Sequence, residues 1–179
     1  MTGVQTCALP ISMHKLDDQR AAIRHTIDAI KAFYGRAPRG WESPGLTETF
    51  ETIDILAEEG IEYVADWVID DQPCEIATTT GSVVAMPYTV EINDVPMMSV
   101  AQHASSEWLA RGIRQFDRMY QESGNSARVM AISMHPYLSG VPHRIGYVEE
   151  LFQYVQNKPD VVVWTGEQIL DWFRGVVPK

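Results

Sequence analysis

The chain has 179 residues, of which 45% are hydrophobic and 21% are charged. This composition is typical of a globular domain and argues against disordered or low-complexity classes. Acidic residues outnumber basic ones by 24 to 14, which gives a formal net charge of -10. That charge disfavours nucleic-acid and anionic-membrane partners, and no apolar run is long enough to span a bilayer. The sequence therefore predicts a soluble, cytoplasmic protein with no nucleic-acid or membrane partner.

The first twelve residues differ from the rest of the chain. They contain no Asp, Glu, Lys or Arg, and they lack the basic region and the apolar stretch of a secretory signal. We interpret residues 1–12 as a non-native leader and residues 13–179 as the folding part. On this interpretation, natural sequence that precedes residue 13 is missing.

Helices and strands are expected to alternate along the first half of the folding part. Apolar residues at helical spacing predict one helix that ends at Gly35 and a second that ends at Gly60. The apolar run 61–65 predicts a short buried strand, and the polar stretch 66–82 predicts a loop. Residues 82–92 are expected to be extended, with prolines that limit any long strand.

The second half continues the alternation. We predict helices over 108–124 and 145–155, and strands buried on both faces over 128–134 and 160–164. The segment Thr165–Gln168 has the spacing of a capping box and should open a final helix. Strands that alternate with helices of this length indicate parallel pairing and an α/β fold.

The number of strands limits the architecture. A complete (β/α)₈ barrel takes about 250 residues, which is more than this chain offers. The sequence alone therefore leaves two alternatives, an open α/β sheet or the second part of a barrel.

Three candidate catalytic side chains follow the predicted elements. Arg36 follows the first helix, Asp66 follows the strand 61–65, and His135 follows the strand 128–134. In α/β folds the carboxyl ends of parallel strands carry the active site. Each residue also has a structural interpretation: a surface salt bridge for Arg36, a turn or cap for Asp66, and a buried core histidine for His135.

Other polar residues give weaker signals. Glu91, Asn93 and Asp94 form a polar cluster for which a solvated turn is the default interpretation. The five histidines and two cysteines show no spacing that would let two of them share a metal ion. We therefore expect no tight metal site in this chain.

Taken together, these motifs resemble those of the polysaccharide deacetylase (NodB-homology) family over residues 14–175. The matching residues are Arg36, Pro38 and Gly40 for an RxPxG motif, Asp66 and Trp67 for a DW motif, and Ser133, Met134 and His135 for an LxH motif. The stretches PYTVEINDVPMM and HPYLSGVPHR look closest to a branch with peptidoglycan-deacetylase-like proteins and metal-independent allantoinases.

The resemblance implies a distorted seven-stranded (β/α) barrel, of which this chain would be the incomplete, truncated C-terminal part. It implies a hydrolase that acts on non-peptide carbon–nitrogen bonds of amides or N-acetylated sugars. In the full-length family, zinc or another divalent metal bound by upstream motifs activates the water. We expect no tight metal binding by this fragment, and little activity from it alone.

The resemblance also implies roles for individual residues. His135 would be the general acid, Asp66 would orient it, and Arg36 would pair with a catalytic aspartate. The expected substrate-binding residues are Trp41, Trp67, Glu91, Asp94, Ser133 and Tyr137.

Ser133 departs from the family pattern, which has an apolar residue beside the acetyl methyl group. A hydroxyl there suits a ureido or other polar amide, so an allantoinase-like cyclic amidohydrolase is an alternative. A catalytically inactive binding or assembly module is another. Because a truncated barrel exposes sheet edges, we also expect the chain to self-associate as a homo-oligomer.

Overall fold

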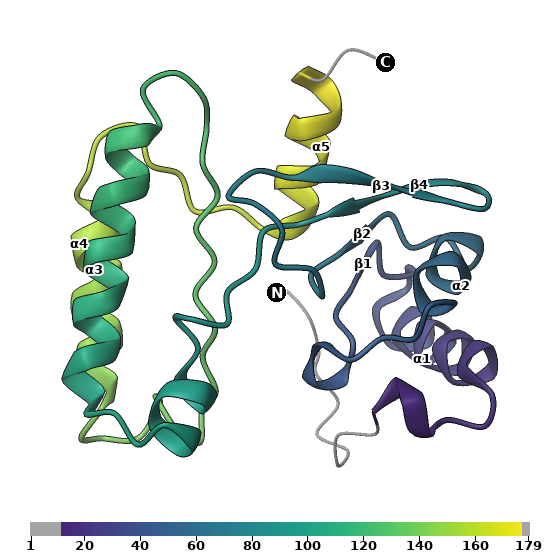
Figure 1. The fold of residues 1–179 in the computed structure, drawn as a ribbon, viewed down its shortest axis with the longest axis horizontal. Helices are drawn as coiled ribbons and strands as arrows, with labels where there is room; N and C mark the ends of the chain where they lie inside the picture. The colour runs from purple at the N-terminus through teal and green to yellow at the C-terminus, as the bar shows by residue number, and fades with distance from the viewer. Residues whose placement is uncertain (1–11, 177–179) are drawn as a thin grey trace. The chain divides into compact units, whose positions relative to one another are not determined.

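A computed structural model describes residues 12–176 (Figure 1). These residues form two units, which are described separately. Unit 1 consists of residues 12–86 and 164–176, and unit 2 consists of Pro87–Val163. The expected leader, apart from Ser12, lies outside the described residues.

A four-stranded sheet forms the centre of unit 1. Its strands are β1 (Gly40–Trp41), β2 (Tyr63–Val64), β3 (Cys74–Thr78) and β4 (Gly81–Ala85). The strand order is β1-β2-β4-β3, with β1, β2 and β4 parallel and β3 antiparallel to β4. The parallel pairing agrees with the predicted α/β class. The loop predicted over 66–82 is wrong in part, because β3 and the start of β4 form a hairpin there.

The helices of unit 1 cover this sheet and enclose a small apolar core. They are η1 (Met13–Lys15), α1 (Gln19–Tyr34), η2 (Pro44–Leu46), α2 (Thr52–Glu58) and α5 (Gly166–Val176). Helix α1 ends as predicted, because Gly35 adopts the left-handed conformation that closes a helix, with φ 80°. Ile23 of α1 and Leu56 of α2 are completely buried together with Val64 and Val83 of the sheet.

The predicted capping box opens α5. The backbone N–H of Thr165 donates to the Gln168 side chain at 2.8 Å, and the N–H of Gln168 donates to the Thr165 hydroxyl at 3.3 Å. The two bonds satisfy backbone donors that the first turn of a helix leaves free. Leu170 then packs against Val84 and Met86 of the sheet.

Unit 2 is built around two helices that pack along each other, α3 (Ser105–Glu122) and α4 (Ile145–Gln156) (Figure 1). Both confirm predicted helices, although α3 begins three residues earlier than Trp108. A short π-helix, η3 (Val95–Val100), precedes them. The helices approach closely at Gly112, because an added Cβ atom there would lie 2.7 Å from Leu151.

The predicted buried strands at 128–134 and 160–164 are wrong. Within the described residues, 128–134 makes a single parallel bridge, between Ser133 and Asn93, and 160–164 forms no strand. Val162 and Val163 are exposed. A strand requires backbone partners along its length, and residues 12–176 offer these segments almost none. The fold is thus a mixed α/β fold, whose closure into a barrel is not seen in this part of the chain.

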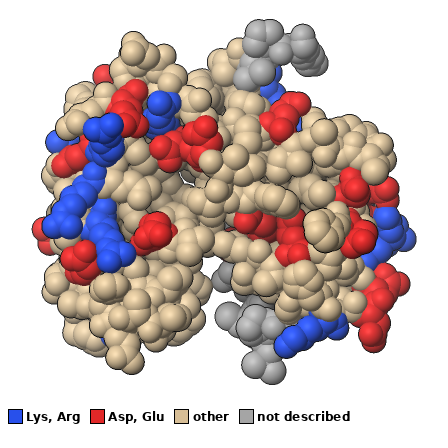
Figure 2. All heavy atoms as spheres, in the orientation of Figure 1, with Lys and Arg blue, Asp and Glu red and all other residues tan. Residues whose placement is uncertain are grey.

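The described surface is consistent with the acidic composition. On the face of unit 2 drawn in Figure 2, acidic and basic side chains alternate instead of separating into patches. Two such pairs on α3 join Arg111 to Glu107 and Arg118 to Glu122. No helix within residues 12–176 combines the length and the apolarity that a membrane span requires.

Candidate functional site

In unit 2, the side chains of His135 and Asp94 form a close hydrogen-bonded pair. The Nδ1 atom of His135 lies 2.6 Å from Oδ1 of Asp94, and the backbone N–H of His135 donates to Oδ2 at 2.7 Å. The pair forms because Asn93 and Ser133 bridge in parallel, which brings their following residues together. The bridge thus places an imidazole directly beside a carboxylate.

Asp94 is enclosed by donors on every side that the structure describes. Its side chain is 0% exposed, and Oδ2 also accepts the Ser139 hydroxyl at 2.5 Å. Ser139 reaches the carboxylate because residues 135–139 form a tight turn, in which the Ser139 N–H donates to the His135 carbonyl. Three donors on one carboxylate compensate for its loss of water.

One ring nitrogen of His135 is hydrogen-bonded to Asp94, and the other can face a ligand. Because Asp94 accepts a hydrogen bond at Nδ1, Nε2 is the atom that can exchange a proton with a substrate. The imidazole side chain is 22% exposed, so solvent or a ligand can contact it. This is the arrangement of a histidine acid–base group whose orientation is fixed by a carboxylate.

A second polar contact involves Ser133, which precedes His135 by two residues. The hydroxyls of Ser133 and Tyr88 lie 2.9 Å apart. Ser133 is buried, and Met130 and Ile132 of the same segment pack into the helical core of unit 2.

The structure places the other two predicted binding residues of unit 2 at the surface. Tyr137 packs edge-on against the His135 ring, with 5.5 Å between ring centroids, and is otherwise exposed. The Glu91 side chain is 83% exposed and lies 3.9 Å from Arg111. Their substrate contacts stay predictions.

The candidate residues of unit 1 form a separate cluster after β2. The backbone N–H of Ser43 donates to Oδ1 of Asp66 at 2.6 Å, and the indole N–H of Trp67 donates to Oε2 of Glu48 at 2.9 Å. The indole N–H of Trp41 donates to the Ser43 hydroxyl at 3.0 Å. Asp66 therefore ties the segment after β2 to the segment after β1.

Glu48 has an unusual protonation equilibrium in this cluster. Burial, together with the neighbouring side chain of Asp66 and its charge, raises the pKa of Glu48 to about 8. The indole N–H of Trp67 opposes part of this shift, because it stabilises the ionised carboxylate. Glu48 is consequently protonated at neutral pH while it contacts Asp66.

Arg36 and Gly40 of the RxPxG motif have structural partners in unit 1. Nη1 of Arg36 donates to both carboxylate oxygens of Glu167 in α5, at 2.8 and 3.0 Å. At Gly40, an added Cβ atom would lie 2.0 Å from the Tyr63 ring, so only glycine fits there. The predicted pairing of Arg36 with a catalytic aspartate stays a prediction.

The structure adds one pairing and corrects one expectation. Asp94 hydrogen-bonds the His135 ring within unit 2, and Asp66 accepts the Ser43 N–H within unit 1, so the expected role of Asp66 toward His135 stays a prediction. Asp94 was expected in a solvated turn that contacts substrate, but its enclosed side chain is engaged by His135 and Ser139. Motif order could not reveal this pairing, because it depends on the bridge between two distant segments.

Three contributing residues escaped the sequence analysis. Ser139 follows His135 by four residues, a spacing that a one-turn hydrogen bond would suggest. Tyr88 has no local signal, because its partner Ser133 is 45 residues away. Glu48 has none either, because Trp67 is 19 residues away and Asp66 directly precedes Trp67.

The described residues do not fit the zinc centre that the resemblance implies. Across residues 12–176, no three His, Cys, Asp or Glu side chains gather into a group that could hold a metal ion.

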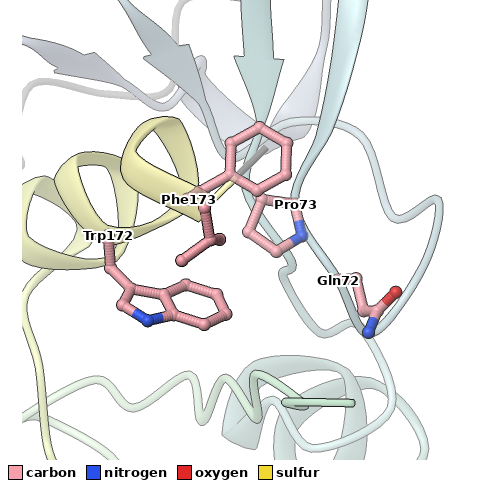
Figure 3. A pocket seen from close by; sticks show the side chains of 5 residues that line it. Gln72, Pro73, Trp172 and Phe173 are labelled. Atoms are coloured by element: carbon pink, nitrogen blue, oxygen red, sulfur yellow. The ribbon is translucent and has the colours of Figure 1, made fainter. Parts of the chain in front are cut away.

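Unit 1 also contains a small pocket (Figure 3). It has a volume of about 180 Å³ and is lined by Gln72, Pro73, Trp172, Phe173 and Val176. Ligand pockets usually have volumes of about 300–1,000 Å³.

Comparison with known proteins finds similar proteins, although no family model matches the chain. A polysaccharide deacetylase-type protein of Schizosaccharomyces pombe is 27% identical over 148 residues, which cover 74% of this chain and 46% of that protein. A crystal structure of a polysaccharide deacetylase-type protein from Pseudomonas aeruginosa is 26% identical, with a TM-score of 0.80. That match covers 88% of this chain and 54% of the other.

A crystal structure of Puue allantoinase matches at a TM-score of 0.87 and 23% identity, over 94% of this chain and 57% of that one. At this identity the match shows a shared fold. The chain spans about half the length of the relatives it matches. These matches confirm the resemblance predicted from the motifs: the chain is similar to polysaccharide deacetylase-type proteins and shares part of their fold.

Proposed function

We propose that the chain carries the acid–base residues of a hydrolase that cleaves non-peptide carbon–nitrogen bonds in amide substrates. The observation that carries the proposal is the enclosed Asp94–His135 hydrogen bond, which leaves Nε2 for proton transfer. The similarity of the chain to polysaccharide deacetylase-type proteins supports an amide as the substrate class. Because the chain spans about half of these relatives, the activity of a whole protein is part of the proposal.

In the proposed reaction, water adds to the amide carbonyl carbon, and the carbon–nitrogen bond of the adduct then breaks. His135 donates the proton on Nε2 to the departing amine nitrogen and regains a proton from the added water as the carboxyl product forms. Asp94 keeps its hydrogen bond to Nδ1 and holds the ring in one orientation. Asp94 acts through His135, so it is a positioning residue.

A second candidate function is the hydrolysis of a ureide, and the Tyr88–Ser133 contact favours it. These two hydroxyls lie 2.9 Å apart, and Ser133 is two residues from His135 in the sequence. Hydroxyl groups can hydrogen-bond the additional N–H and C=O of a ureide, whereas an acetyl methyl offers them no partner. The fold shared with Puue allantoinase is compatible with this candidate.

The test uses a chimaera in which this chain replaces the matched region of the Pseudomonas aeruginosa protein. Two substrates are compared, an N-acetylated chito-oligosaccharide by acetate release and hydantoin by ring opening. In the chimaera, His135→Ala should lower kcat by about 10²–10⁴-fold, the range for losing an acid–base group. His143→Ala is the matched control, because His143 is an exposed histidine of the same unit.

The outcomes separate the candidates. Acetate release supports the deacetylase, and hydantoin opening supports the ureide hydrolase. A Ser133→Leu variant should shift the preference toward the acetylated substrate. A folded chimaera that cleaves neither substrate, or equal losses in His135→Ala and His143→Ala, contradicts the proposed function.

A further inference from the structure

In unit 1, the carboxyl groups of Glu48 and Asp66 contact each other, and the proposed hydrolysis gives this contact no role. We call these two residues the carboxyl pair. One oxygen of each accepts an N–H: Glu48 Oε2 from Trp67 and Asp66 Oδ1 from Ser43. The other oxygens, Glu48 Oε1 and Asp66 Oδ2, are enclosed, and no N–H or O–H group of the described residues bonds to them.

Two ionised carboxylates in this position would be unfavourable. The two enclosed oxygens would lose water without gaining a donor, and the like charges of the carboxylates would repel. If one carboxyl carries a proton, its hydroxyl becomes a donor to the other. A single hydrogen bond between Glu48 Oε1 and Asp66 Oδ2 then satisfies both enclosed oxygens.

Glu48 is the group that carries this proton. Burial and the neighbouring Asp66 raise the pKa of Glu48 to about 8, and no other charged group contributes to this shift. A metal ion between the two carboxylates is a poorer explanation, because the described residues bring no third metal-binding side chain to the carboxyl pair.

We propose that Glu48 shares one proton with Asp66 and is thereby a positioning residue, which fixes the Asp66 carboxylate and the Trp67 indole in single orientations. The pair joins the segment after η2 to the segment after β2. When Glu48 ionises, repulsion between the carboxylates should move the Glu48 carboxylate away from Asp66, and the indole that donates to it should move with it. The value of a fixed indole for substrate binding rests on the proposed function, whereas the shared proton does not.

The experiment follows Trp67 by ¹⁹F NMR in the whole chain labelled with 5-fluorotryptophan. A Trp67→Phe variant identifies the Trp67 resonance. Between about pH 5.5 and 9.5, this resonance should shift with a midpoint near that of a carboxyl with a raised pKa. Trp108 is the internal control, because it is completely buried in unit 2.

Two substitutions separate the protonated from the ionised state. The amide in Glu48→Gln can donate to Asp66 and accept from Trp67, so the resonance should keep its low-pH position throughout. Glu48→Ala removes both the titrating group and the acceptor of the indole N–H, so its Trp67 resonance should not titrate. Asp66→Asn should move the midpoint toward the ordinary range of glutamate. Glu51→Gln, an exposed glutamate three residues away, is the matched control and should titrate like the unmodified chain.

A Trp67 resonance that does not titrate overturns the shared proton. A titration that persists in Glu48→Gln overturns the assignment to Glu48. If Glu48→Ala fails to fold, the unmodified chain and Glu48→Gln still decide the question. None of these measurements requires turnover, so their failure is distinct from failure of the proposed hydrolysis.

Discussion

Asp94 in unit 2 and Asp66 in unit 1 are both shielded from water, but their partners differ. Asp94 accepts from three donors and holds a histidine ring. Asp66 accepts one N–H and contacts a second carboxyl group. The number of donors around a buried aspartate thus decides whether its oxygens are satisfied within the fold or left to a neighbouring carboxyl group. A motif identifies the residue but not this environment.

The largest effect should follow loss of the Asp94 carboxylate. Asp94→Ala leaves the His135 and Ser139 donors buried without an acceptor, and it should lower the free energy of unfolding by about 3–5 kcal/mol. Urea denaturation measures the change. Glu91→Ala, at the exposed end of the same segment, should stay within about 0.5 kcal/mol. Equal changes in both variants would remove the contrast between Asp94 and its neighbours.

The carboxyl pair should make the free energy of unfolding depend on pH. The folded-state pKa of Glu48 is about 8, above the value of about 4.3 for an unfolded glutamate. Between these values the folded chain binds more protons than the unfolded chain, so the contribution of Glu48 to stability declines as pH rises through this window. Glu48→Gln should lose this decline. Thermal melts of both chains from about pH 5 to 9 test it, and parallel curves would contradict it.

The smallest effect should come from an uncharged contact in unit 1. Thr165→Ala removes the hydroxyl that accepts the Gln168 N–H, and it should lower stability by about 1 kcal/mol. Thr80→Ala, at an exposed turn position, is the matched control. A loss in Thr165→Ala as large as that in Asp94→Ala would mean that charge does not explain the difference between the units.

The elements predicted well from the sequence are those whose signals are local. Helices α1, α3 and α4 have apolar residues at helical spacing over three turns or more, and α5 has its capping box within four residues. The α/β class followed from their alternation with apolar segments. Helix α2 is shorter than the apolar pattern predicted. Phe50 belongs to that pattern, but it precedes α2 and is 99% exposed.

The elements predicted poorly depend on distant partners. Segment 128–134 has the composition of a buried strand, but a strand forms only where other backbone is available to pair with it. The β3–β4 hairpin was not predicted, because its polar residues resemble those of a loop. In the structure, burial alternates along β3 as it does in a strand. Pairing of His135 with Asp94 spans 41 residues, so spacing in the sequence gave no access to it.

The double attachment of His135 has a consequence for the entropy of catalysis. Asp94 binds both the backbone N–H and the ring of the same residue, so one carboxylate restricts the main chain and the side-chain torsions together. The loss of conformational entropy is thus met during folding, before any substrate arrives. In the proposed reaction, a proton donor prepared in this way needs little rearrangement when the carbon–nitrogen bond breaks.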